Sequence, residues 1–230
     1  MSYISLDSST SSTTVVVFNE DLSIQKKFQK EHQQIYTSEG FVEHDLEEIY
    51  NNLIELIKAA AEIAPDPQLI SITNQRETFT LFDKFTGKPV RNAVVWQCTR
   101  GEEICEKILN NKDHSELITQ KTGLKANTFF SASKLKWVIE NEPHIKEGLI
   151  KGNILFGTID TYLLYRLTKC KEYVTDTTNA SRTLLFNCID NRWDNELFSI
   201  FEIEQFKLAD VKSSSSNFGL SNFENSFLKS

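Results

Sequence analysis

The residues best suited to chemistry lie at the end of a predicted strand. An apolar run at residues 69–72 predicts a buried strand, which Asn74, Gln75, Arg76 and Glu77 closely follow. The arginine supplies several N–H donors and the glutamate supplies carboxylate acceptors, so the adjacent pair can hydrogen-bond a small polyhydroxylated ligand. The alternative is an ordinary solvated ion pair in a loop, which is common and contributes little to stability.

A second candidate site lies near the start of the chain. Residues 8–13 all carry hydroxyl groups and come directly after Asp7, at the end of another predicted strand. A turn of this kind can offer backbone N–H and side-chain O–H groups to phosphate, and the Asp7 carboxylate suits a hydrated cation. The alternative is a plain polar hairpin tip.

The elements that position these groups begin with a β-meander, which has the hydroxyl run as its first turn. Helical spacing of apolar residues then predicts a long helix that Asp45 caps. Such a chain, a meander followed by alternating helices and strands, indicates an α/β domain with a mixed central sheet on which the helices pack. Strands are predicted at residues 3–7, 14–18, 22–29, 79–82, 93–95 and 152–156, and helices at 45–63, 99–109, 131–140, 159–167 and 195–200.

Two of these helices carry further expectations. Ile104, Ile108 and Leu109 are the expected apolar positions of the helix at 99–109, and Thr158 is a candidate N-cap for the helix at 159–167. Two cysteines seven residues apart, Cys98 and Cys105, could share one helix face, but the cysteine spacing favours reduced thiols over a metal site or a disulfide.

Composition excludes several classes of protein. Hydrophobic residues make up 40% of the chain and charged residues 25%, both ordinary values for a globular protein. The net charge of −7 argues against nucleic-acid binding. No apolar run approaches the length of a membrane span, and the first residues lack the pattern of a secretory signal, so a cytoplasmic location is expected.

Five stretches make the chain resemble a known family when they are taken together. They are Ile-Thr-Asn-Gln-Arg-Glu-Thr at 72–78, Val-Val-Trp-Gln-Cys at 94–98, Phe-Gly-Thr-Ile-Asp-Thr at 156–161, Gly-Phe-Val-Glu-His-Asp at 40–45, and Thr-Asp-Thr-Thr-Asn-Ala-Ser-Arg-Thr at 175–183. Over nearly the whole chain, the sequence resembles the members of the FGGY carbohydrate-kinase family that phosphorylate glycerol.

The resemblance implies an actin-like, ribonuclease-H-like fold in which two domains close over ATP, Mg²⁺ and the polyol. It implies that residues 1–211 form the first, polyol-binding domain, that residues 212–230 form an irregular linker or tail, and that the second, ATP-binding domain is absent. The site residues that it implies are Arg76, Glu77, Trp96 and Phe129 for glycerol, Thr10, Ser11, Ser12 and Thr14 for the nucleotide phosphates, and Asp7 for Mg²⁺ through water.

Departures from the family pattern affect the same sites. The family has a glycine at the position of Ser9, an arginine at Thr14 and a tyrosine at Phe129. The family's Gly-Asp-Gln-Gln segment, which carries the catalytic base, is not found in these 230 residues, so we expect no catalytic base and negligible turnover from this chain alone. Two functions remain open: half of an ATP-dependent glycerol-phosphorylating enzyme, or a non-catalytic binding or regulatory module. Either could form a homo-oligomer or associate with a full-length kinase.

Overall fold

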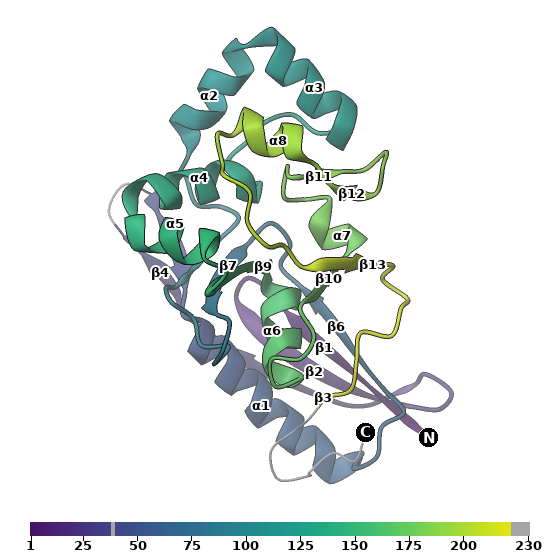
Figure 1. Cartoon of the computed structure of the whole chain (residues 1–230). Helices are drawn as coiled ribbons and strands as arrows, with labels where there is room; N and C mark the ends of the chain where they lie inside the picture. Colours follow the sequence, from purple (N-terminus) through teal and green to yellow (C-terminus); the bar gives the residue numbers. More distant parts are fainter. Residues whose placement is uncertain (38–39, 222–230) are drawn as a thin grey trace.

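A four-stranded mixed sheet carries both candidate sites in the structure, a computed structural model that describes residues 1–37 and 40–221 (Figure 1). Its strand order is β3-β2-β1-β6. β1 (Ser2–Ser8) pairs antiparallel with β2 (Ser12–Asn19) and parallel with β6 (Leu69–Asn74), while β3 (Ile24–Glu31) pairs antiparallel with β2. The predicted opening meander and mixed sheet are confirmed.

A second, fully antiparallel sheet was not expected from the sequence. Its order is β4-β5-β8-β7-β9. Two short ribbons complete the strands. The remaining strands are β4 (Gln34–Tyr36), β5 (Val42–His44), β7 (Phe79–Asp83), β8 (Ala93–Val94), β9 (Ile154–Thr158), β10 (Val174–Asp176) paired with β13 (Asp210–Lys212), and β11 (Phe186–Asn187) paired with β12 (Arg192–Trp193).

The helices include every one that the sequence predicts. They are α1 (Leu46–Ile63), α2 (Glu102–Asn110), α3 (Lys112–Thr122), α4 (Ser131–Asn141), α5 (Pro143–Ile150), α6 (Ile159–Leu167), α7 (Thr177–Ala180) and α8 (Asn195–Ile200). Asp45 caps α1 as predicted, because its carboxylate accepts the backbone N–H groups of Glu47 and Glu48. α3, α5 and the short α7 were not predicted. Among the described residues, no helix is long and apolar enough to cross a membrane.

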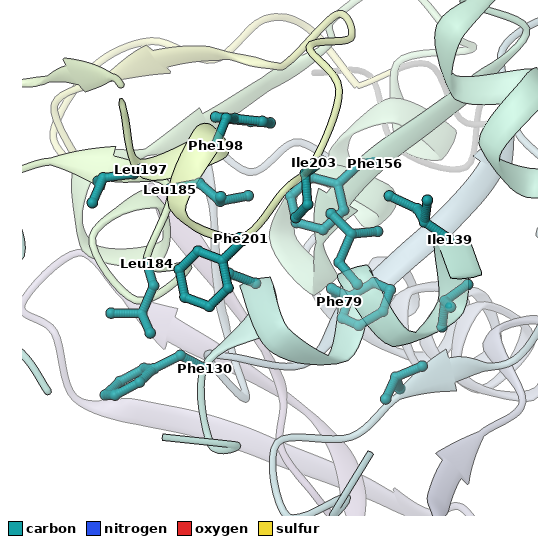
Figure 2. Packing of buried hydrophobic residues seen from close by; sticks show 14 of the residues in the cluster. Phe79, Phe130, Ile139, Phe156, Leu184, Leu185, Leu197, Phe198, Phe201 and Ile203 are labelled. Carbon is teal, nitrogen blue, oxygen red and sulfur yellow. The ribbon is translucent and has the colours of Figure 1, made fainter. Parts of the chain in front are cut away.

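Two hydrophobic clusters hold the sheets in place. One fills the space between the first sheet, α1 and α6, and it includes Leu6, Val15 and Leu53. The other packs α4, α5 and α8 with the second sheet. Figure 2 shows this second cluster, which contains Phe79 and Phe156 from the second sheet and Ile203 from the segment after α8. The two hydrophobic clusters therefore hold in place the strands whose ends carry the candidate sites.

Three local expectations were wrong. β6 is an edge strand rather than a buried one: Ile70 and Ile72 pack toward the core, whereas Leu69 on the opposite face is 58% exposed. In α2, Leu109 is exposed and Cys105 is buried instead. Thr158 is at the N-cap position of α6 but makes no cap bond; its hydroxyl donates to the Asp160 carboxylate.

The cysteines and the tail can also be compared with expectation. Cys98 and Cys105 do not share a helix face, since α2 begins only at Glu102, but both are buried and all four cysteines are free, as predicted. The first residue of the expected tail, Lys212, belongs to β13, and the serine run at 213–216 is irregular. Residues 222–230 lie outside the described part, so the domain boundary stays a prediction.

Candidate functional site

The ends of β1 and β6 bring the two candidate sites together. Six residue pairs align these parallel strands, from Tyr3 opposite Leu69 to Ser8 opposite Asn74. Gln75 continues the pairing, because its backbone N–H donates to the Ser8 carbonyl at 2.8 Å. The hydroxyl turn that follows Ser8 and the charged residues that follow Gln75 therefore leave the sheet at the same edge.

Glu77 forms an ion pair, but Arg76 is not its partner. Glu77 has a left-handed backbone, with φ of 68°, and its carboxylate accepts the Nε–H of Arg182 at 2.6 Å. Arg76 is exposed, and no described residue hydrogen-bonds its guanidinium. The predicted adjacent Arg76–Glu77 pair is thus replaced by a pair that spans 105 residues of sequence, and Arg76 is left open to a ligand.

Arg182 is the residue of this site that sequence reasoning missed. The side chain of Glu77 is 16% exposed and that of Arg182 is 33% exposed, so the pair is partly sheltered from water. The Arg182 guanidinium also lies 4.8 Å from the centre of the Phe130 ring, a cation–π contact that fixes its orientation. Its place in the family-like stretch at 175–183 was the available signal.

Trp96 and Phe129, which the resemblance implies as glycerol-binding residues, lie side by side and form an apolar surface, called the apolar wall below. Their ring centres are 5.7 Å apart in an edge-to-face contact, and half of Phe129 is exposed. The backbone N–H of Trp96 donates to the Thr78 hydroxyl at 3.1 Å, one residue after Glu77. These contacts place an apolar surface close to the Glu77–Arg182 pair, an arrangement that suits a ligand with both carbons and hydroxyl groups.

The hydroxyl turn is tightly bonded to itself. Both the backbone N–H and the hydroxyl of Ser9 donate to the Ser12 carbonyl, at 3.0 and 2.8 Å. The buried Ser12 hydroxyl accepts from Gln29 at 2.9 Å, whereas Ser11 is exposed. The Ser9 N–H is therefore not free for phosphate, and Ser11 is the most open of the predicted phosphate ligands.

Thr10 joins the turn to the apolar wall. Its hydroxyl accepts the indole Nε1–H of Trp96 at 3.1 Å, a contact between residues 86 positions apart. A hydroxyl that accepts one bond still has its own proton to donate. Thr10 therefore keeps a donor of its own while it holds Trp96, and this hydrogen bond links a residue of one predicted site to a residue of the other.

Asp7 and Thr14 face each other on the open face of the sheet. They are register partners across β1 and β2, and Thr73 pairs with Asp7 on the other side. Partial burial raises the pKa of Asp7, and the nearby Lys27 opposes this effect. A lone carboxylate of this kind fits a cation that keeps its waters, as Mg²⁺ commonly does. In the described part of the chain, no group of three or more His, Cys, Asp or Glu side chains could hold a metal directly.

Gln75 organises a buried network beneath the turn that the sequence did not reveal. Its side-chain amide donates to the Ser9 carbonyl and to Nδ1 of His44, each at 3.1 Å, while its oxygen accepts from Thr78. His44 is fully buried and lies 4.9 Å from the ring of His32. Burial, together with His32, lowers the pKa of His44 to about 4, so the imidazole is neutral and acts as an acceptor.

Comparison with known proteins gives this geometry a context. Residues 2–229 match the N-terminal domain of the FGGY family of carbohydrate kinases. Glycerol kinase from Shewanella pealeana is 44% identical over 220 residues, which are 94% of this chain and 44% of that protein. Glycerol kinase 2 from Thermotoga maritima is 44% identical over 224 residues, or 95% of this chain and 45% of that protein.

Solved structures agree with the sequence matches. The crystal structure of Plasmodium falciparum glycerol kinase with ADP superposes with a TM-score of 0.91 and 39% identity, covering 97% of this chain and 45% of that one. Gluconate kinase from Lactobacillus acidophilus, at 22% identity and a TM-score of 0.86, shares the fold over 97% of this chain and 44% of its own. The expected actin-like, ribonuclease-H-like fold is confirmed, and the chain spans somewhat less than half the length of these relatives.

Proposed function

Because the chain belongs to the FGGY family of carbohydrate kinases, we propose that it is the polyol-binding half of a glycerol kinase. In the complete reaction, the γ-phosphate of ATP passes to a terminal hydroxyl of glycerol and gives sn-glycerol 3-phosphate. The relatives that support this assignment are named glycerol kinases and are more than twice as long as the chain. The 230 residues on their own are proposed to bind glycerol with negligible turnover.

The observation that carries this proposal is the contact between the Trp96 indole and the Thr10 hydroxyl. A kinase must hold the acceptor hydroxyl next to the phosphate that it receives, because phosphoryl transfer depends mainly on positioning and on neutralising charge. One hydrogen bond connects Trp96, on the proposed polyol side, with Thr10, on the proposed phosphate side.

Each side of the surface has a chemical role in the proposal. Arg76 donates hydrogen bonds to glycerol hydroxyls and Glu77 accepts them, while Trp96 and Phe129 cover the carbon atoms. Phe129 lacks the hydroxyl of the family's tyrosine, which costs on the order of 1 kcal/mol of binding if that contact is not replaced.

On the phosphate side, the hydroxyls of Thr10, Ser11 and Thr14 are the accessible donors, whereas the predicted ligand Ser12 has its hydroxyl buried. Asp7 is the residue that would hold Mg²⁺ through water, and the ion would neutralise phosphate charge when bound.

A non-catalytic binding or regulatory module is the second candidate. One observation favours it: the Ser9 amide, which a phosphate-binding turn would present to the nucleotide, is bonded to Ser12 instead. Such a module would still bind the polyol but would bind the nucleotide phosphates less tightly.

A coupled assay that detects ADP formation tests the first candidate. We expect the purified 230-residue chain to show no glycerol-dependent turnover near the roughly 1–100 s⁻¹ that is typical of kinases. A full-length glycerol kinase assayed in parallel is the positive control. Turnover by the chain in that range would contradict the proposal that it is only the binding half.

A further inference from the structure

Lys134 is a fully buried lysine in the first turn of α4, with an exposed fraction of 0%. Its ammonium group donates toward four backbone carbonyls: those of Thr128, of Phe129 at 2.8 Å, of Phe130 at 3.0 Å and of Trp96 at 3.4 Å. An ammonium has three N–H donors, so this ring of carbonyls can satisfy all of them. No part of Lys134 is available for contact with a ligand.

Burying an ammonium group costs free energy unless its N–H donors are hydrogen-bonded. Removal from water disfavours the charged form, and burial lowers the pKa of Lys134 to about 7, with Cys98, Cys105 and Glu77 acting in the opposite direction. Methionine has a similar length and would fill the same space without a charge. The lysine is therefore explained by its four carbonyl contacts rather than by packing alone.

The carbonyls that Lys134 binds belong to the residues of the candidate polyol site. Trp96 and Phe129 form the apolar wall, and the ring of Phe130 lies against the Arg182 guanidinium that pairs with Glu77. The chain continues from Phe130 into Ser131, whose hydroxyl donates to the backbone carbonyl of Glu77 at 3.1 Å. The Lys134 ammonium thus contacts the backbone of both wall residues and of Phe130, which packs against Arg182 of the ion pair.

We propose that Lys134 is a positioning residue of the polyol site, which sets the Trp96–Phe129 wall at a fixed place relative to the Glu77–Arg182 pair. The identity of the ligand, glycerol, rests on the proposed function. The contacts that Lys134 makes do not depend on it. Loss of the ammonium would release residues 128–130 from the backbone of Trp96 while leaving the sheets and their hydrophobic clusters in place.

The first test needs no ligand. In a Trp137→Phe, Trp193→Phe background, Trp96 is the single tryptophan of the chain, and its fluorescence reports its surroundings. Lys134→Met should shift the Trp96 emission to the red and increase its quenching by acrylamide. Lys125→Met, the same change at an exposed lysine, should leave both unchanged. Unchanged Trp96 fluorescence in a folded Lys134→Met protein would overturn the proposal.

A second variant covers the case in which Lys134→Met does not fold. Lys134→Arg keeps a cation with N–H donors and should retain the Trp96 fluorescence of the parent protein. A red shift of the Trp96 emission in a folded Lys134→Arg protein would show that keeping a cation does not keep Trp96 in place, and would overturn the proposal.

The second test measures glycerol by isothermal titration calorimetry. Lys134→Met should raise the dissociation constant roughly tenfold, with Lys125→Met unchanged. If the wild-type chain itself binds no glycerol, the proposed function fails, whereas the fluorescence comparison still decides the role of Lys134. Wild-type affinity in Lys134→Met would overturn the positioning role even if glycerol binding is confirmed.

Discussion

Replacing Arg76 with alanine is expected to weaken glycerol binding at least about tenfold and to leave the fold intact. Arg76 is exposed, and no described residue hydrogen-bonds its guanidinium, so its removal breaks no internal contact within the described residues. A hydrogen bond from a charged donor contributes about 1.5–3 kcal/mol, and the nearby Arg182 is already engaged by Glu77. Calorimetric titration with glycerol measures the loss.

The matched control for this variant is Arg192→Ala. Arg192 is also an exposed arginine, but it lies in β12 and pairs with Asp190 only two residues away. We expect its glycerol affinity to equal that of the wild type. Equal affinities in the wild type, Arg76→Ala and Arg192→Ala would remove Arg76 from the site.

Acidification is expected to destabilise the protein through His44. The pKa of His44 falls from its ordinary value near 6.5 to about 4 in the folded chain, because the ring is buried and lies against His32. Between these values the unfolded chain binds more protons than the folded chain does, so stability that is present above pH 6.5 is lost as the pH falls toward 4. At about 1.4 kcal/mol per pKa unit, the loss is on the order of 3 kcal/mol.

Urea unfolding of the wild type and of His44→Asn at about pH 7 and about pH 4.5 measures this effect. Asparagine can keep an acceptor near the position of Nδ1 for Gln75 but does not titrate. Burial raises the pKa of Asp160 to about 6, which adds stability on acidification, so the difference between the two proteins is the informative quantity. His144→Asn, at an exposed histidine of α5, should retain the wild-type pH dependence. A His44→Asn protein with that same dependence would contradict the prediction.

The local elements of the fold were largely predictable because their signals are local. Asp45 and the apolar spacing after it define α1, and short runs of strand-forming residues, separated by the hydroxyl turn, define β1 and β2. α3 was missed because its sequence is mostly polar and buries little more than Ile118 and Thr122. Periodicity finds helices through their buried face, so a helix with a small buried face gives a weak signal.

The position of β6 in its sheet was not predictable from residue types. The run Leu69-Ile70-Ser71-Ile72 is apolar enough for a buried strand, but strand order places it at the edge, where Leu69 faces outward. Burial depends on which elements cover each face, and this is settled by long-range topology.

The candidate site was predictable in its residues but not in its pairings. Sequence neighbours suggested that Arg76 and Glu77 form a pair, yet the turn holds Glu77 with a positive φ and turns its carboxylate to Arg182. The contacts of Lys134 with Trp96, and of Gln75 with His44, likewise join residues more than thirty positions apart. No local spacing rule reports such contacts.

The central claim is that the surface around Glu77, Trp96 and Thr10 binds glycerol. Titration of isotope-labelled wild-type chain with glycerol, followed by nuclear magnetic resonance of backbone amides and indole N–H groups, tests it most directly. We predict saturable shifts at Arg76, Glu77, Phe129 and the Trp96 indole, whose hydrogen bond reaches Thr10. Saturable shifts confined to another part of the chain, or no saturable shift at any glycerol concentration, would contradict it.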